Sequence, residues 1–178
     1  LYSKGKRVDM FVSYDPSFAM MAEWLKQLFG ETEGKNGKGA YPACLFFSRD
    51  LHSIGQFLQQ GRQIFYETMI RIEHPAEDME IPWYAGYPYA GKTMEQINAC
   101  AENGVLRAHQ KAGIPIHEIH IEELNAYTMG QMIYFFEMSA ALSAYVMGVN
   151  PFDQPGVEGY KKNMFALLGK PGYEDEKA

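Results

Sequence analysis

Apolar and polar residues alternate along the chain in blocks that predict strands and helices in turn. Short apolar runs at 7–14, 43–47, 64–73 and 114–121 are typical of strands. Between them, apolar residues recur three or four positions apart over 18–29, 51–61 and 93–112, which predicts helices. Strands that alternate with helices of this length predict an α/β fold, with a mostly parallel sheet covered on both faces.

The ends of the first predicted helix are set by Ser17, which we expect to cap it, and by Gly30, which we expect to end it. A nearly uniform apolar helix is predicted over 124–147, with Glu137 as its only charged residue. A membrane-spanning helix needs about 20 predominantly apolar positions. Polar residues interrupt this stretch, so we expect a buried helix of a soluble protein, with Glu137 paired inside the core.

A last helix is predicted over 153–169, with Asp153 as its cap. One face carries an apolar stripe made of Val157, Tyr160, Met164, Leu167 and Leu168. Lys161 falls within that stripe, whereas Lys162 points to the opposite side. Two explanations of Lys161 stay open. Its stem covers the core while its amine reaches water, or its ammonium group is paired or takes part in function. The free backbone N–H groups at the helix start, with Gln154, could face an anion.

Composition limits the function classes. A chain of 178 residues with 47% hydrophobic residues is suited to one domain with a real core. The net charge is −6 and the basic residues are not clustered, so nucleic-acid binding is not expected. Two cysteines suit a reducing cytoplasm, and residues 1–7 lack the apolar stretch of a signal peptide. We therefore expect a cytoplasmic protein that binds no membrane.

Two segments imitate known binding motifs. The Gly- and Lys-rich turn at 33–39 lacks the Gly spacing and the Ser or Thr of a Walker A loop, so a solvated loop is favoured. Glu118, His120 and Glu122 would share one face of a strand and could bind a metal. The favoured alternative is the solvent side of an edge strand, with His117, Ile119 and Ile121 packed inward.

Two further residues could take part in catalysis, although the sequence pattern alone does not assign a role to either of them. Glu31 is expected just past the end of the first helix, beside the glycine-rich turn, where a carboxylate could act as a base. A surface glutamate in a loop is the commoner explanation. His52 is expected at the start of a helix, where a structural histidine is the usual case.

Three segments together resemble motifs of the bacterial glucose-6-phosphate isomerase family, and the similarity runs through the whole chain. The segments are NPFDQPGVEGYKKNMFALLG at 150–169, SRDLHSIGQ at 48–56 and ETEGK at 31–35. The resemblance implies a sugar isomerase domain, a flavodoxin-like three-layer sandwich with a mostly parallel sheet. It also implies the interconversion of glucose 6-phosphate and fructose 6-phosphate in glycolysis and gluconeogenesis, through a cis-enediol and without metal or cofactor.

The resemblance also implies roles for five residues. By motif position, Glu31 is the base that moves a proton between C2 and C1, and His52 and Lys161 assist ring opening. Gln154 matches a glutamine near the substrate phosphate, and Gln27 matches one that lines the pocket. In the family the histidine comes from the partner subunit, so we expect a homodimer with His52 supplied across the interface.

The chain departs from the family in length. Family members are more than twice as long, and their upstream part supplies a Ser/Thr-rich phosphate loop and an arginine that this chain lacks. Residues 1–178 are therefore expected to be the second sugar isomerase domain of a longer enzyme, inactive or nearly so when isolated. The alternative is a non-catalytic module that binds sugar phosphates. The glutamate, histidine and lysine at all three motif positions argue against that alternative.

Overall fold

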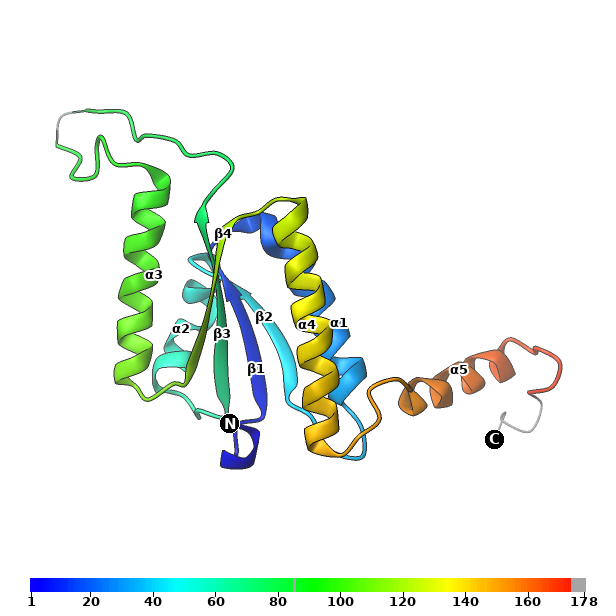
Figure 1. Ribbon diagram of the computed structural model, residues 1–178. Helices are drawn as coiled ribbons and strands as arrows, with labels where there is room; N and C mark the ends of the chain where they lie inside the picture. Colours follow the sequence, from blue (N-terminus) through cyan, green and yellow to red (C-terminus); the bar gives the residue numbers. More distant parts are fainter. Residues whose placement is uncertain (85, 174–178) are drawn as a thin grey trace.

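A computed structural model of the protein describes residues 1–84 and 86–173 (Figure 1). Short 3-10 helices cover Tyr2–Lys4 and Pro16–Phe18. The strands are β1 (Val8–Ser13), β2 (Tyr41–Phe46), β3 (Phe65–His74) and β4 (Ile116–Glu123). The helices are α1 (Ala19–Glu33), α2 (Arg49–Gln60), α3 (Met94–Lys111), α4 (Ala126–Met147) and α5 (Pro155–Leu167). Each predicted strand and helix is present, and their alternation is confirmed.

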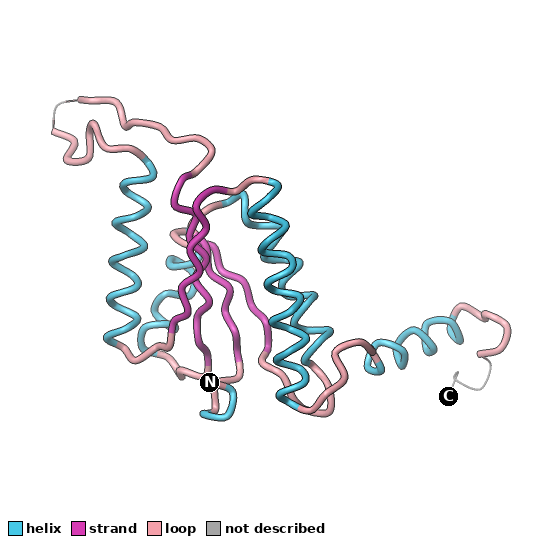
Figure 2. The backbone as a smooth tube through the Cα atoms, viewed as in Figure 1, coloured by secondary structure: helices cyan, strands magenta, loops and turns pink. Residues whose placement is uncertain are grey.

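The four strands form one sheet in the order β2-β1-β3-β4, and every neighbouring pair is parallel. Val8 pairs with both Tyr41 and Phe65, and Glu67 pairs with Ile116. Helices α1 and α4 cover one face of the sheet, and α2 and α3 cover the other (Figures 1 and 2). The expected three-layer α/β sandwich is therefore confirmed.

Each face of the sheet carries its own core because side chains alternate along β1. Phe11 points toward α1 and α4, where its ring meets that of Phe136 edge-on at 6.1 Å. Met10 and Val12 point the other way and pack with Leu58 of α2. The strand is thus buried from both sides, as expected for the interior of a parallel sheet.

The predicted ends of the first helix are both wrong. Ser17 does not cap α1, whose N-cap is Phe18 without a side-chain capping bond; Asp15 caps the short 3-10 helix before it, where its carboxylate accepts the backbone N–H of Ser17 at 2.8 Å. The helix also continues through Gly30 to Glu33, and the N–H of Gly34 donates to the carbonyl of Gly30 at 3.1 Å. Local sequence did not distinguish the two glycines because either can end a helix.

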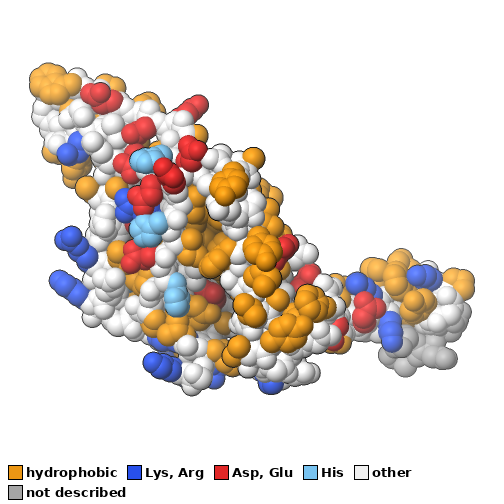
Figure 3. Space-filling model, in the orientation of Figure 1, with side chains coloured by type: hydrophobic (Ala, Val, Ile, Leu, Met, Phe, Trp, Pro, Cys, Tyr) orange, Lys and Arg blue, Asp and Glu red, His pale blue; other side chains and the backbone are white. Residues whose placement is uncertain are grey.

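Helix α4 packs on the sheet with only one face, so the prediction that Glu137 is buried is wrong. Met132, Phe136 and Ala140 are buried, whereas Glu137 is exposed, as is Val146. Figure 3 shows hydrophobic side chains gathered on the visible surface of this part of the molecule. Within residues 1–84 and 86–173, no helix has the length and apolar character needed to cross a bilayer.

Helix α5 extends away from the sheet, as Figures 1 and 2 show. Its apolar stripe was predicted to face inward, but Leu167 and Leu168 are 81% and 75% exposed. Lys161, predicted on the inward side, is therefore not enclosed by the core of this chain. The stripe is mostly exposed within the part of the chain that the structure describes: Tyr160, Met164, Leu167 and Leu168 are exposed, whereas Val157 is half-buried.

Candidate functional site

Glu31 lies in the last turn of α1, one turn after Gln27, and not past the helix end as predicted. Residues four apart share one helix face, which brings the two side chains together. The Gln27 Nε2 donates to Glu31 Oε1 at 3.2 Å. The helix thus presents a half-buried carboxylate whose first oxygen is held by an amide.

The second oxygen of the same carboxylate is held from the other end of the chain. Gln154 Nε2 donates to Glu31 Oε2 at 2.6 Å. Gln154 occupies the N-cap position of α5 but makes no side-chain capping bond, which leaves its amide available to Glu31. The structure therefore brings together three of the five predicted site residues around one carboxylate.

The turn that follows α1 is only partly the solvated loop that its composition suggested, since Gly34 and residues 36–38 are exposed but Lys35 is not. Lys35 is buried, and its Nζ donates to the carbonyl of Asn150 and lies 3.1 Å from Asp153 Oδ1. Asp153 was predicted to cap the last helix, and that prediction is wrong because its carboxylate pairs with Lys35 instead. No sequence pattern singled out Lys35, although this residue belongs to the ETEGK segment that carries the resemblance at Glu31.

A glycine makes this tight turn possible. Gly39 has φ +98°, and a Cβ at this position would lie 2.9 Å from the backbone carbonyl carbon and oxygen of Glu33. Only glycine fits both the left-handed conformation and this close approach. The turn therefore folds back against the end of α1 and holds Lys35 beside the site.

Two buried carboxyl groups lie next to this end of α1. Burial raises the pKa of Glu33, although hydrogen bonds from the Ser143 side chain and the Ala40 backbone oppose the effect. Burial also raises the pKa of Asp9 to about 7, against the hydrogen bond that its Oδ1 accepts from the Thr68 hydroxyl at 2.8 Å. Both groups favour the protonated form more than an exposed carboxyl does.

His52 is not brought to this carboxylate. It is exposed in the first turn of α2, after the end of β2, whereas Glu31 precedes the start of β2. A strand of this length spans roughly 20 Å at about 3.3 Å per residue. The two side chains therefore lie toward opposite ends of the sheet in one copy of the chain.

Lys161 is also separate from the carboxylate. It lies two turns into α5 from Gln154, and its Nζ is 3.1 Å from the Glu158 carboxylate one turn earlier. Its side chain is 41% exposed. In this chain alone, Lys161 makes a surface ion pair on the extended helix.

The residues of β4 that were considered as metal ligands are arranged as an exposed edge. Glu118, His120 and Glu122 are exposed, as the favoured alternative predicted, and His120 Nδ1 lies 2.5 Å from Glu73 Oε1. His117 was expected to pack inward but is exposed, with its ring near that of Tyr66. The described ranges contain no group of three or more His, Cys, Asp or Glu residues placed to hold a metal ion.

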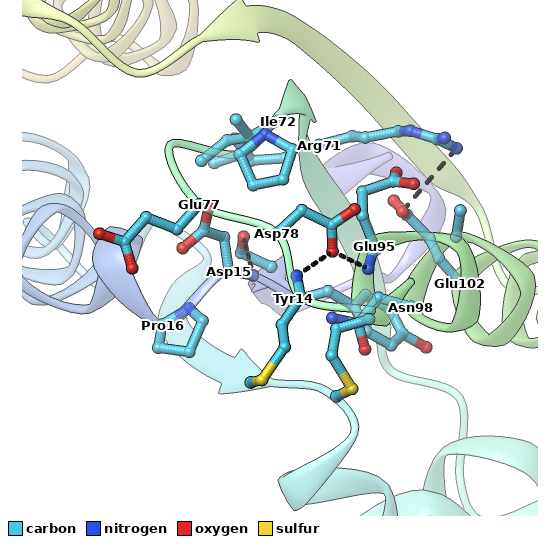
Figure 4. Close-up of a pocket in the computed structure, with 16 residues that line it drawn as sticks. Tyr14, Asp15, Pro16, Arg71, Ile72, Glu77, Asp78, Glu95, Asn98 and Glu102 are labelled. Carbon is cyan, nitrogen blue, oxygen red and sulfur yellow. Dashed lines mark hydrogen bonds and ion pairs between the residues drawn. The ribbon is translucent and has the colours of Figure 1, made fainter. Parts of the chain in front are cut away.

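A cavity of about 480 Å³ lies at the carboxyl ends of β1 and β3, away from the predicted site residues (Figure 4). Arg71 faces it, 3.8 Å from the carboxylate of Glu102. Asp78 also lines it and accepts the backbone N–H of Glu95 at 3.0 Å. Acidic side chains outnumber basic ones in its wall, so the cavity is poorly suited to a phosphate group.

Comparison with known sequences confirms the resemblance over the whole chain. Proteins named glucose-6-phosphate isomerase from Bacillus cytotoxicus and Heliobacterium modesticaldum are each 51% identical over 183 aligned positions, covering 100% of this chain and 41% of theirs. A protein of the same name from Leptospira biflexa is 52% identical over 182 positions, 99% of this chain and 40% of its own. The chain thus spans about two fifths of these relatives. No model of a protein family matches it.

Two solved structures share the fold. A hypothetical protein from Thermus thermophilus superposes with a TM-score of 0.85 at 26% identity, over 92% of this chain and 41% of that one. A glucose-6-phosphate isomerase from Chlamydia trachomatis superposes with a TM-score of 0.75 at 20% identity, over 93% of this chain and 35% of that one. The three-layer arrangement is therefore one that much longer proteins contain as a part.

Proposed function

We propose that this chain is the part of a glucose-6-phosphate isomerase that supplies the catalytic base. The observation that carries the proposal is the Glu31 carboxylate, held by one amide on each oxygen in a chain similar throughout to proteins of that name. The reaction would interconvert glucose 6-phosphate and fructose 6-phosphate, a step of glycolysis and gluconeogenesis. The substrate is a phosphosugar, and neither metal nor cofactor is needed for the proton transfer.

The geometry suits a proton transfer between adjacent carbons. Once the sugar ring opens, C2 lies next to a carbonyl, and a base can remove its proton to form a cis-enediolate. The same group returns the proton to C1, so that no net proton is lost. Gln27 and Gln154 hold one Glu31 oxygen each, and a carboxylate oxygen can accept more than one hydrogen bond, so a lone pair remains for the substrate.

The placement of His52 supports a homodimer. Within one copy, His52 and Glu31 lie toward opposite ends of β2, so His52 of the same copy is poorly placed to assist ring opening at Glu31. We propose that His52 is supplied across the dimer interface. Lys161 would act at the ring oxygen when α5 rests against the rest of the enzyme.

The remaining three fifths of the relatives' length would provide what this chain lacks. We propose that it forms an N-terminal sugar isomerase domain, which contributes the phosphate loop and an arginine that stabilises the enediolate. The isolated chain should then show little or no turnover in a coupled assay that detects fructose 6-phosphate. Normal turnover by the 178-residue chain would contradict this division of roles.

The decisive experiment replaces the base in an intact enzyme, meaning a protein of the relatives' full length that contains this chain. Glu31→Gln should lower turnover by at least about 10²-fold and should leave phosphosugar binding in place. It should also stop the incorporation of solvent deuterium into the product. The matched control is Glu23→Gln, which changes an exposed carboxylate paired with Lys26 on the same helix and should retain activity. Retained turnover in Glu31→Gln would refute the proposal.

The same measurements discriminate the second candidate, a non-catalytic module that binds sugar phosphates. Such a module would bind the phosphosugar equally well with Glu31→Gln and would show no turnover in the intact protein to begin with. We further propose a cytoplasmic location, since the substrate is a cytoplasmic metabolite and the chain has only two cysteines, both free. Imaging of a fluorescent fusion would test it.

A further inference from the structure

The turn after α1 contains a lysine whose charge is removed from water. The Lys35 side chain is only 6% exposed, and an ammonium in such a place is costly unless it is paired and hydrogen-bonded. Its Nζ donates to the carbonyl of Asn150 and lies 3.1 Å from Asp153 Oδ1. Both partners belong to the connector between α4 and α5, so Lys35 joins two segments that are far apart in the sequence.

The same connector delivers Gln154 to the carboxylate. Asp153 directly precedes Gln154, and Lys35 follows Glu31 by four residues. The ion pair Lys35–Asp153 and the hydrogen bond Gln154–Glu31 are therefore two parallel links between the same two segments. Because neighbouring links share the cost of ordering the chain, loss of one should weaken the other.

We infer that Lys35 is a positioning residue that holds the Gln154 amide on the Glu31 carboxylate through Asp153. The ion pair fixes the residue next to Gln154, so only side-chain torsions remain to be ordered when the amide donates its hydrogen bond. Lys35 touches no reacting group itself. The structural part of this inference stands on the contacts alone, and its kinetic part rests on the proposed function.

The chain offers a matched set of variants. Lys35→Met removes the ammonium and keeps an unbranched apolar stem, whereas Asp153→Asn removes the opposite charge from a side chain that is 50% exposed. Lys38→Met is the control, because the Lys38 Nζ donates to the carbonyl of Met147, the last residue of α4, at 2.7 Å and pairs with no carboxylate among residues 1–84 and 86–173. Lys35→Arg keeps the positive charge, so it should retain much of the positioning of the Gln154 amide that Lys35→Met loses.

The first readout is the side-chain amide resonance of Gln154 in the ¹⁵N-labelled chain. It should move toward the position of a solvent-exposed amide in Lys35→Met and in Asp153→Asn, and it should stay in place in Lys38→Met. If Lys35→Met does not fold, Asp153→Asn carries the test alone. An unmoved Gln154 resonance in the folded variants would overturn the inference.

The second readout is kinetic and uses the intact enzyme. Lys35→Met should lower kcat between about tenfold and a hundredfold, with KM changed by less than about threefold, because the base is misplaced and binding is kept. The double variant Lys35→Met/Gln154→Ala should be no slower than Gln154→Ala alone, since both changes act through one contact. Additive losses would overturn the inference. Full activity of Glu31→Gln would refute the proposed function and leave the Gln154 resonance test valid.

Discussion

The buried carboxyl group of Asp9 should make the stability of the folded protein depend on pH. Asp9 lies on the central strand β1 and is only 9% exposed. Burial raises its pKa from the ordinary 3.8 to about 7, although the hydrogen bonds from Thr68 and Tyr66 oppose the effect. The folded protein therefore keeps a proton on Asp9 at pH values where the unfolded chain has lost it.

The sign and size of the effect follow by linkage. A raised carboxyl pKa contributes stability below pH 3.8, and that stability is lost as the pH rises to about 7. One pKa unit corresponds to about 1.36 kcal/mol, so complete ionisation of Asp9 lowers the free energy of unfolding by about 4 kcal/mol. Burial also raises the pKa of Glu33 and Glu102, which adds a slope of the same sign.

Asp9→Asn isolates this contribution. The amide keeps an oxygen to accept the Thr68 hydroxyl and cannot ionise, so the variant and the original protein should have similar stability near pH 4. Near pH 8 the variant should be more stable by up to about 4 kcal/mol. Urea unfolding followed by the fluorescence of Trp24 and Trp83 measures both values across this range.

The matched control for Asp9→Asn is a substitution at an exposed carboxylate. Glu77→Gln makes the same change of charge on an exposed side chain and measures the effect of net charge alone. Equal pH slopes for Asp9→Asn and the original protein would show that Asp9 does not hold a proton in the folded state.

Four substitutions probe the fold, with stability measured by the same urea unfolding. Leu25→Ala empties a fully buried site between α1 and the sheet and should cost about 2–5 kcal/mol, whereas Leu167→Ala on the exposed stripe should change stability by less than about 0.5 kcal/mol. Asn125→Ala removes a cap that accepts the N–H groups of Tyr127 and Thr128 and should cost about 1 kcal/mol; an unchanged midpoint would contradict this role. Gly39→Ala should cost at least about 1 kcal/mol, and no loss would mean that the turn after α1 can relax.

The sequence predicted the order and type of the main helices and strands because their hydrophobic periods differ. It failed at the end of α1, where Gly30 and Gly34 are equally able to stop a helix. The structure distinguishes them: a Cβ at Gly34, the C-cap, would lie 2.6 Å from the Gly30 carbonyl oxygen, whereas a Cβ at Gly30 would lie at an ordinary contact distance, 3.7 Å from the Pro42 side chain. The strand order was not predictable either, since parallel pairing depends on contacts between distant segments.

Burial was overestimated on α4 and α5 for a related reason. A helix pattern reports that a face is apolar but not which part of the molecule covers it. Glu137 was predicted to be buried because α4 is apolar nearly all round, yet only one face of that helix packs on the sheet.

The candidate site was predictable only in part. Spacing alone places Gln27 and Glu31 on one helix face, whereas Gln154 lies 123 positions from Glu31 and was matched only through the resemblance. The Lys35–Asp153 ion pair was not predictable from local sequence. An aspartate before a helix is most simply interpreted as a cap, and a lysine among glycines is most simply interpreted as solvated. Ion pairs between segments so far apart leave no periodic trace.

The all-parallel sheet has a consequence for how the chain acquires its structure. Parallel neighbours cannot form a hairpin, so each pairing requires a crossover to close first, and the contacts are separated by long stretches of sequence. Val8 meets Phe65 only after β3 has been made, which at about 5–20 residues per second leaves β1 without that neighbour for seconds during synthesis. We therefore expect slow refolding, on the millisecond to second scale in stopped-flow experiments. We also expect the nascent chain to need protection by chaperones until β3 has been synthesised.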